Sequence, residues 1–408
     1  MQFNLSDINP AALHVMWVLD GAGHEGRICG GAVRDLIMAR DPKDWDIATT
    51  ARPEAVITIM EKAGLQVVPT GLKHGTVTVV VGNENIEVTT LRVDVATDGR
   101  HAEVAFTEDW MTDSLRRDFT MNAMYLDVNL VVHDYHNGMA DLHEGTIRFV
   151  GAPEDRIRED YLRILRYFRF CAKMAGNAKF RDDDLLYPIF RETAKGLEQI
   201  SGERIWAEIG KILQMGTTPA WGQFNRMKRA GVLDHIGLSS VDSNLLIPIP
   251  DTRPAVMLTA SFPKTQAGIG EAVALLRDRY KVSREELNPV LFAKRFFDTP
   301  PTRITSTQML ATHQKSDVLA WIAIMNRKEP VTTGPSSTGF NTLYRDIEGM
   351  AVPEFPITGQ DLIDLGFTPG PEMGKILRQL RDVWAGVEFS ASREYLINLA
   401  YQTMGHIK

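Results

Sequence analysis

The spacing of apolar residues changes after about residue 150, and this change limits the folds open to the chain. Before it, β-rich runs alternate with helical patterns. Residues 76–81 and 85–91, for example, flank Gly82-Asn83-Glu84, which is typical of a hairpin turn. From Pro153 onward, apolar residues recur at helical spacing. We therefore expect an α+β N-terminal domain with a mixed sheet, followed by all-α domains.

The remaining elements of the first part follow from local signals. A helix over 32–40 should stop before Asp41-Pro42, because the residue before a proline is pushed out of the helical region. The pattern also predicts helices over 10–20 and 53–63, and strands near 27–29, 45–49, 125–132 and 147–150.

The chain of 408 residues is too long for one compact core. Helical patterns recur near 157–172, 183–195, 203–214, 219–231, 268–280, 284–297, 316–326 and 359–407. Proline-rich stretches interrupt them, and 331–339 is a linker candidate. The boundaries that we predict divide the chain into residues 1–150, 151–215, 216–330 and 331–408.

Composition excludes some classes of protein. The longest apolar runs are too short to cross a bilayer, and the N-terminus lacks a signal-peptide pattern. Two cysteines, Cys29 and Cys171, are too few for a disulfide framework. These features predict a cytoplasmic protein that does not enter membranes. The net charge of −7 argues against nucleic-acid binding by the whole surface, but it leaves room for a local basic groove.

A glycine turn between a predicted strand and a predicted helix suggests a phosphate site. Gly30 and Gly31 allow close backbone approach at a helix start, where N–H groups face an anion. Arg34 follows in the first turn of that helix and can grip phosphates bidentately. By itself, the pattern fits a simple tight turn equally well.

Two aspartates follow this turn. On a strand, Asp44 and Asp46 point to one face while Trp45 points to the core. Paired carboxylates repel unless a cation lies between them, and hard oxygen ligands suit magnesium. The alternative is a solvated pair of loop aspartates. Glu87, on the following hairpin, is either a third carboxylate of the site or the exposed side of a strand.

Two clusters of arginines and carboxylates complete the pattern. In the first, Arg116 and Arg117 precede Asp118, and one arginine can reach a triphosphate while the others hold it in place. The same residues also fit a surface ion-pair cluster.

In the second cluster, Asp160 and Arg163 are helical neighbours, and their acceptor and donors can imitate the Watson–Crick partner of a base. A helix-surface salt bridge is the alternative. Arg166 and Arg169 follow at steps of three, each of which drifts about 60° around a helix. Arg169 should therefore lie opposite Asp160 and beside the apolar face.

With these elements in this order, the sequence resembles the class II tRNA nucleotidyltransferases, or CCA-adding enzymes, which share a superfamily with bacterial poly(A) polymerases. The matching motifs are Gly30-Gly31-Ala32-Val33-Arg34-Asp35, Asp44-Trp45-Asp46, Arg116-Arg117-Asp118 through Ala123, and Glu159-Asp160-Tyr161-Leu162-Arg163. The segment 357–374 also resembles the C-terminal region of this family.

The resemblance implies a catalytic head (1–150), a helical neck that reads the base (151–215), a helical body (216–330) and a helical tail that binds tRNA (331–408). It implies that Asp44 and Asp46 are catalytic and bind Mg²⁺. Gly31, Arg34 and Arg117 would bind the triphosphate. Asp160 and Arg163, assisted by Arg166 and Arg169, would select CTP and then ATP. The expected partner is the 3′ end of tRNA, and DNA is not expected.

Two observations favour complete CCA addition within this family. Residues 71–75 lack the Gly-Arg-Arg-Phe-like segment of poly(A) polymerases, and residues 92–106 resemble the flexible loop that CC-adding enzymes lack. Poly(A) polymerase and CC-adding enzyme stay open as alternatives. A glycosyltransferase that uses D-x-D, and an RNA-binding protein that has lost catalysis, are more distant ones.

Overall fold

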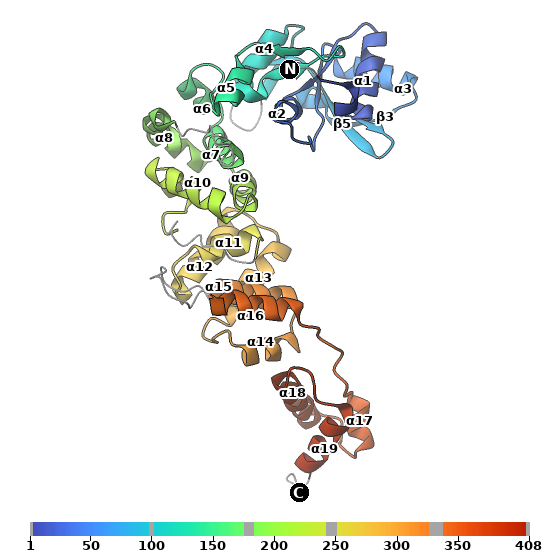
Figure 1. The fold of residues 1–408 in the computed structure, drawn as a ribbon, viewed down its shortest axis with the longest axis vertical. Helices are drawn as coiled ribbons and strands as arrows, with labels where there is room; N and C mark the ends of the chain where they lie inside the picture. Colours follow the sequence, from blue (N-terminus) through green and yellow to red (C-terminus); the bar gives the residue numbers. More distant parts are fainter. Residues whose placement is uncertain (1–2, 98–101, 175–182, 242–250, 326–337, 405–408) are drawn as a thin grey trace. The chain divides into compact units, whose positions relative to one another are not determined.

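The computed structural model describes residues 3–97, 102–174, 183–241, 251–325 and 338–404 (Figure 1). The chain forms two compact units. The first comprises Met1–Ile200 and Arg226–Ile236, and the second comprises Ser201–Asn225 and Gly237–Lys408. The predicted linker at 331–339 lies largely outside the described residues.

A seven-stranded mixed sheet forms the centre of the first unit, in the order β3-β4-β5-β2-β1-β8-β9. All neighbouring strands are antiparallel except β2 and β5, which are parallel. The strands are β1 (Gly26–Cys29), β2 (Ile47–Thr49), β3 (Gln66–Gly71), β4 (Thr76–Val81), β5 (Glu84–Thr90), β8 (Met124–Leu126) and β9 (Val132–Asp134). The predicted hairpin is therefore confirmed as β4 and β5.

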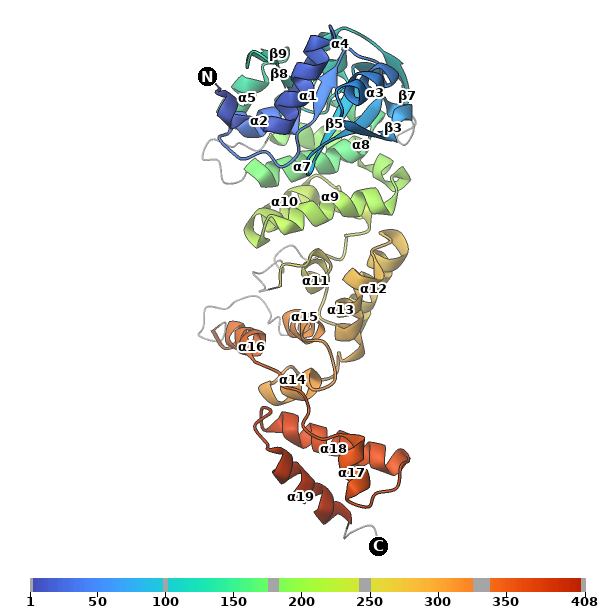
Figure 2. The same cartoon turned by 90° about the vertical axis from the view of Figure 1, so that its right-hand side faces the viewer.

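Helices pack against this sheet. α1 (Pro10–Gly21) and α3 (Pro53–Lys62) contact each other and the sheet, and α2 (Gly31–Ile37) contacts β1 and β8 (Figures 1 and 2). α4 (Trp110–Leu115) and α5 (Gly138–Glu144) complete this part. α2 ends earlier than the predicted residue 40, because the chain turns at Ala39, whose φ is 52°.

Residues 92–106 differ from the predicted flexible loop. β6 (Arg92–Thr97) and β7 (Ala102–Phe106) form an antiparallel two-stranded ribbon outside the main sheet. Residues 98–101 lie outside the described residues. The ribbon begins directly after Leu91, which is buried in a cluster that includes Trp110 and Tyr125.

Three further strand predictions were partly wrong. The strand predicted near 125–132 is instead the antiparallel pair of β8 and β9, with a turn between them. β2 begins at Ile47, so Asp44 and Asp46 precede the strand instead of lying on it. The Asp46 carbonyl nevertheless accepts a hydrogen bond from the Cys29 amide at 2.9 Å, which extends the ladder by one residue. Residues 147–150 form only an isolated bridge, Phe119 with Phe149, because their main-chain partners belong to the loop at 118–120.

The long helix predicted near 157–172 is interrupted. α6 (Pro153–Glu159) ends at Asp160, whose backbone is extended, and α7 begins at Leu162 and ends at Met174. The Leu162 amide donates to Asp160 Oδ1 at 3.1 Å, so the aspartate caps the second helix instead of lying within it. α8 (Tyr187–Thr193) follows in this unit.

The second unit is helical in its described residues, and the unit boundary passes through α10. Its helices are α9 (Gly202–Gln214), α10 (Thr217–Arg229), α11 (Pro254–Ala260), α12 (Gln266–Ala274), α13 (Arg284–Arg295), α14 (Arg303–Leu310), α15 (Lys315–Met325), α16 (Thr338–Gly349), α17 (Gly359–Asp364), α18 (Pro371–Gly386) and α19 (Arg393–Met404). Among the described helices, none is both long and apolar enough to cross a membrane.

Candidate active site

The glycine turn lies between β1 and α2, as predicted. Gly30 has φ 68° and ψ −121°, a backbone conformation that strongly favours glycine. A Cβ atom at this position would also lie only 3.2 Å from Arg117 Nη1. Gly31 starts α2, and a Cβ atom there would lie 3.5 Å from Arg34 Nη2. The turn therefore lies against both arginines that the sequence assigns to triphosphate binding.

Three carboxylates gather beside this turn. The parallel register aligns Ile47 with Val88, so Asp46 and Glu87, the residues before them, are neighbours. Burial, followed by the charges of Glu87 and Asp44, raises the pKa of Asp46 to about 6, while Arg117 opposes the rise. Trp45 is buried between the two aspartates, as predicted.

This donor set fits a divalent cation, since it consists of hard oxygens whose mutual repulsion a cation would relieve. Within the described ranges, no three acidic, histidine or cysteine side chains are close enough together to hold a metal by themselves. Asp44 and Asp46 would therefore need further oxygens, such as those of a nucleotide triphosphate, to complete the coordination of a metal.

Arg34 and Arg117 are held rigidly. Arg34 Nη1 donates to Asn122 Oδ1 at 2.6 Å, and its Nε donates to Asp35 Oδ1 at 3.0 Å. Arg117 Nη1 donates to the Asn122 carbonyl at 3.4 Å, and its Nε donates to Tyr125 Oη at 3.1 Å. Most of both side chains is buried, so little ordering remains when they bind an anion.

Asn122 joins the predicted motifs to one another, a role that the sequence motif alone does not reveal. Its side chain accepts from Arg34 and donates from Nδ2 to Asp118 Oδ1 at 3.0 Å. Asp118 Oδ2 in turn accepts from Arg166 Nε at 2.7 Å. One buried amide thus connects the glycine turn, the arginine motif and α7.

Asp160 and Arg163 do not face each other as neighbours on one helix. Arg163 Nη1 donates to the Arg156 carbonyl and to Glu159 Oε2, both at 2.8 Å. Its Nη2 donates to the Arg116 carbonyl at 3.0 Å. These bonds use three of its five N–H donors, and its Nε has no hydrogen-bond partner among the described residues, so Nε is available to a ligand.

The last two predicted arginines differ in their surroundings. Arg166 binds Asp118, but Arg169 lies over the Phe170 ring, 4.2 Å from its centroid. This position agrees with the predicted place of Arg169 beside the apolar face. Lys173, which the sequence reasoning did not single out, lies 2.9 and 3.0 Å from the two carboxylate oxygens of Asp35 and so ties α7 to α2.

Comparison with known proteins agrees with the family resemblance of the sequence motifs. The poly A polymerase head domain family matches residues 26–148, which include the glycine turn, the carboxylates and the arginine motif. The matched head domain and the site define the chain as a nucleotidyltransferase.

Relatives match over nearly the whole chain. It is 38% identical to the CCA tRNA nucleotidyltransferase 1, mitochondrial, of Danio rerio over 405 residues, covering 93% of this chain and 88% of that protein. It is 32% identical to the CCA-adding enzyme of Streptococcus gordonii over 389 residues, covering 90% and 91%. The chain therefore belongs to the CCA tRNA nucleotidyltransferase family.

Solved structures agree on the fold. The Bacillus stearothermophilus CCA-adding enzyme in complex with CTP has a TM-score of 0.74 at 23% identity, covering 98% of this chain and 99% of that one. The Thermotoga maritima CCA-adding enzyme complexed with tRNA has a TM-score of 0.68 at 20% identity, covering 98% and 97%. The predicted fold class, an α+β head followed by helical domains, is confirmed.

Proposed function

We propose that this chain adds CCA to the 3′ end of tRNA without a template, uses CTP and ATP, and releases pyrophosphate. The observation that carries this proposal is the joining of Arg34 and Arg117 to α7 through Asn122, Asp118 and Arg166. This network connects a triphosphate site to residues that can read a base. The relatives named above are CCA-adding enzymes, which supports the same reaction.

In this reaction the 3′-hydroxyl of the tRNA attacks the α-phosphate, and pyrophosphate departs. Gly31, Arg34 and Arg117 bind and orient the triphosphate, and the two buried guanidinium groups offset the negative charge of the leaving pyrophosphate. Magnesium, when held by Asp44 and Asp46, would supply Lewis-acid activation of the attacking hydroxyl and further charge neutralisation. Glu87 adds a further negative charge beside Asp46, and a bound cation would offset the repulsion between them.

We assign base selection to Asp160 and Arg163, with Arg166 and Arg169 assisting. Arg163 keeps its Nε donor for a base while three carbonyl and carboxylate oxygens fix the rest of its guanidinium. A donor and an acceptor that both contact one base discriminate bases by about 1–3 kcal/mol. Arg166 acts mainly by holding Asp118, and Arg169 contributes positive charge next to Phe170.

We also propose that the chain is divided into four domains. Residues 1–150 form the head, 151–215 the neck, 216–330 the body and 331–408 the tail. Cys29 and Cys171 are buried and form no disulfide, which agrees with a reducing compartment, and we propose the cytoplasm. Three relatives are named mitochondrial. A localisation experiment therefore has to distinguish the cytoplasm from mitochondria.

The experiment supplies the protein with Mg²⁺, CTP, ATP and tRNAs that end before CCA, at C or at CC. We expect every acceptor to end in CCA. Products that stop at CC would favour a CC-adding enzyme, long adenosine tails would favour a poly(A) polymerase, and tRNA binding without incorporation would favour a protein without catalysis.

A matched pair of variants tests the carboxylates. Asp44→Asn should reduce addition of both nucleotides by at least about a hundredfold, since one metal ligand is lost. Asp41→Asn removes the same charge from an exposed position three residues away and should leave the rate unchanged. Equal activity of the two variants would show that Asp44 is not a metal ligand of the active site.

A further inference from the structure

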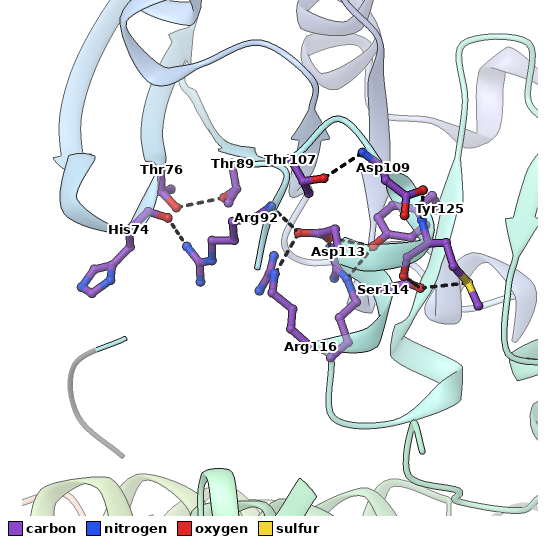
Figure 3. Close-up of polar contacts among 12 residues, drawn as sticks. His74, Thr76, Thr89, Arg92, Thr107, Asp109, Asp113, Ser114, Arg116 and Tyr125 are labelled. Atoms are coloured by element: carbon purple, nitrogen blue, oxygen red, sulfur yellow. Dashed lines mark hydrogen bonds and ion pairs between the residues drawn. The ribbon is translucent and has the colours of Figure 1, made fainter. Parts of the chain in front are cut away.

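One buried carboxylate outside the predicted site accepts hydrogen bonds from three parts of the head. The side chain of Asp113, on α4, is fully buried. Its Oδ1 accepts from the Arg116 Nε at 2.8 Å and from the backbone amide of Arg92 at 3.1 Å. Its Oδ2 accepts from Tyr125 Oη at 2.7 Å (Figure 3). The same oxygen accepts from Arg117 Nη2 at 3.4 Å.

These four donors use both oxygens of the carboxylate. Burial alone would raise the pKa of Asp113, but the charges of Arg116 and Arg117, with the hydrogen bond from Tyr125, hold it below its ordinary value. The group is therefore an anion at neutral pH. A buried anion is stable only with such partners, and each partner is in turn held in place by it.

Arg117 receives most of its orientation from this arrangement. Its Nη2 contacts Asp113 directly, and its Nε donates to the same Tyr125 hydroxyl that donates to Asp113. Asp113 and Tyr125 thus grip one edge of the guanidinium, while Nη1 faces Gly30 and the Asn122 carbonyl.

The same carboxylate also reaches the ribbon formed by β6 and β7. Arg92 is the first residue of β6, and its amide bonds to Asp113. The Arg92 side chain continues outward and donates from Nη1 to the carbonyl of His74 (Figure 3). The start of the ribbon and the double-arginine motif therefore share one anchor.

We propose that Asp113 is a positioning residue that holds Arg117 against the triphosphate and ties it to the start of the β6–β7 ribbon. This inference rests on the proposed function, because it assigns Arg117 to the triphosphate. Asp113 acts only through its four donors, which belong to Arg92, Arg116, Arg117 and Tyr125, and does not itself contact the nucleotide. Since the triphosphate is common to CTP and ATP, the effect of Asp113 is the same for both.

Asp113→Asn tests this with little change in volume. An amide offers one acceptor where the carboxylate offers two, so one pair of donors loses its partner and Arg117 loses its counter-charge. We expect KM for CTP and for ATP to rise about tenfold each, and kcat to fall as well, because Arg117 also offsets charge on the leaving pyrophosphate. The preference for CTP over UTP should stay the same, because Asp160 and Arg163 are untouched.

Two comparisons separate positioning from a structural effect. Asp109→Ala removes the N-cap of the same helix, where Asp109 accepts from the amides of Met111 and Thr112. It should lower the melting temperature and leave KM unchanged. Tyr125→Phe removes only the hydroxyl that bridges Asp113 and Arg117, and it should raise both KM values less than Asp113→Asn does.

A double-mutant cycle decides whether Asp113 works through Arg117. Added to Arg117→Ala, Asp113→Asn should change KM less than twofold, since the guanidinium that it positions is gone. A full further tenfold rise would overturn the proposal, as would equal KM values for Asp113→Asn and the wild type. Absence of CCA addition by the wild type would instead refute the proposed function.

Discussion

At the scale of single residues, the site depends on side chains that are held before any ligand arrives. Arg34 is fixed by Asn122 and Asp35, and Arg166 is fixed by Asp118. Such fixed donors cost little reorganisation when they bind charge, which is the physical basis of electrostatic preorganisation. The residues that hold the arginines therefore matter as much as the arginines themselves.

The contribution of the charged Asp118 side chain to the stability of the folded protein depends on pH and can therefore be measured. Burial would raise the pKa of Asp118, but Arg166 and the hydrogen bonds from Asn122 and the Phe119 amide hold it below its ordinary value of 3.8. A lowered pKa in the folded state stabilises the protein at pH values above the unfolded pKa. That stabilisation disappears as pH falls through the folded value.

We expect Asp118→Asn to lower the free energy of unfolding by about 1.5–3 kcal/mol at pH 7. The difference from the wild type should shrink below about pH 4, where the unfolded wild-type chain takes up a proton. Denaturant unfolding of both proteins from pH 7 to pH 3 measures this. A difference that stays constant over the whole range would show that the charge of Asp118 does not stabilise the head.

At the scale of elements, the break between α6 and α7 decides where Asp160 and Arg163 lie, the residues that we propose to read the base. Tyr161, between the two helices, packs on Gly196. A Cβ atom at Gly196 would lie 2.1 Å from the ring of Tyr161. The Tyr161 ring therefore occupies a space that only glycine at position 196 leaves open. The position of the neighbouring Asp160 depends on this packing.

Gly196→Ala should displace Tyr161 and with it Asp160. We expect the preference for CTP over UTP to fall about tenfold, which corresponds to about 1.4 kcal/mol of lost discrimination. Overpacking should also lower the stability by about 1–3 kcal/mol. Competition assays with both nucleotides measure the preference. Arg163→Ala is the reference variant, because it removes a residue to which we assign base selection.

Gly21→Ala is the matched control, because a Cβ atom there meets nothing within 4 Å. Its nucleotide preference should equal that of the wild type. Unchanged preference in Gly196→Ala would mean that the break between the helices does not position the base-reading residues.

The elements also show how far the sequence predicts the structure. The hairpin of β4 and β5 was predictable, because alternation of side chains and a turn at Gly82 are local signals. The break at Asp160 was not, because no glycine or proline marks it. It is stabilised by distant residues, namely Gly196 under Tyr161 and the Arg116 carbonyl on Arg163.

The same distinction applies to the site. The glycine turn and the arginine motif were predicted as partners, and the structure brings Gly30 and Arg117 together. Asp113 and Asn122 were not given roles, since a buried connector has no motif of its own. Its importance becomes visible only when strands and helices far apart in the sequence are placed in three dimensions.

At the scale of the whole molecule, the proposal assigns nucleotide binding to the first unit and tRNA binding to the helical tail. In α18, Lys375 pairs with Glu372 at 2.6 Å, and Arg381 lies over the Phe355 ring. Arg378 is exposed and forms no hydrogen bond or ion pair within the described part of the chain. It is therefore the cation of this helix that is most available for a phosphate.

Arg378→Gln should weaken tRNA binding by roughly three- to tenfold and lower the salt dependence of binding by about one unit of slope, as expected for one lost phosphate contact. KM for CTP at saturating tRNA should not change, because the nucleotide site lies in the other unit. Gln379→Glu changes the net charge by the same amount at the next position. If both variants weaken binding equally, only overall charge matters and α18 makes no specific contact. A loss confined to Arg378→Gln, measured by tRNA titration between 50 and about 200 mM salt, assigns the contact to that side chain.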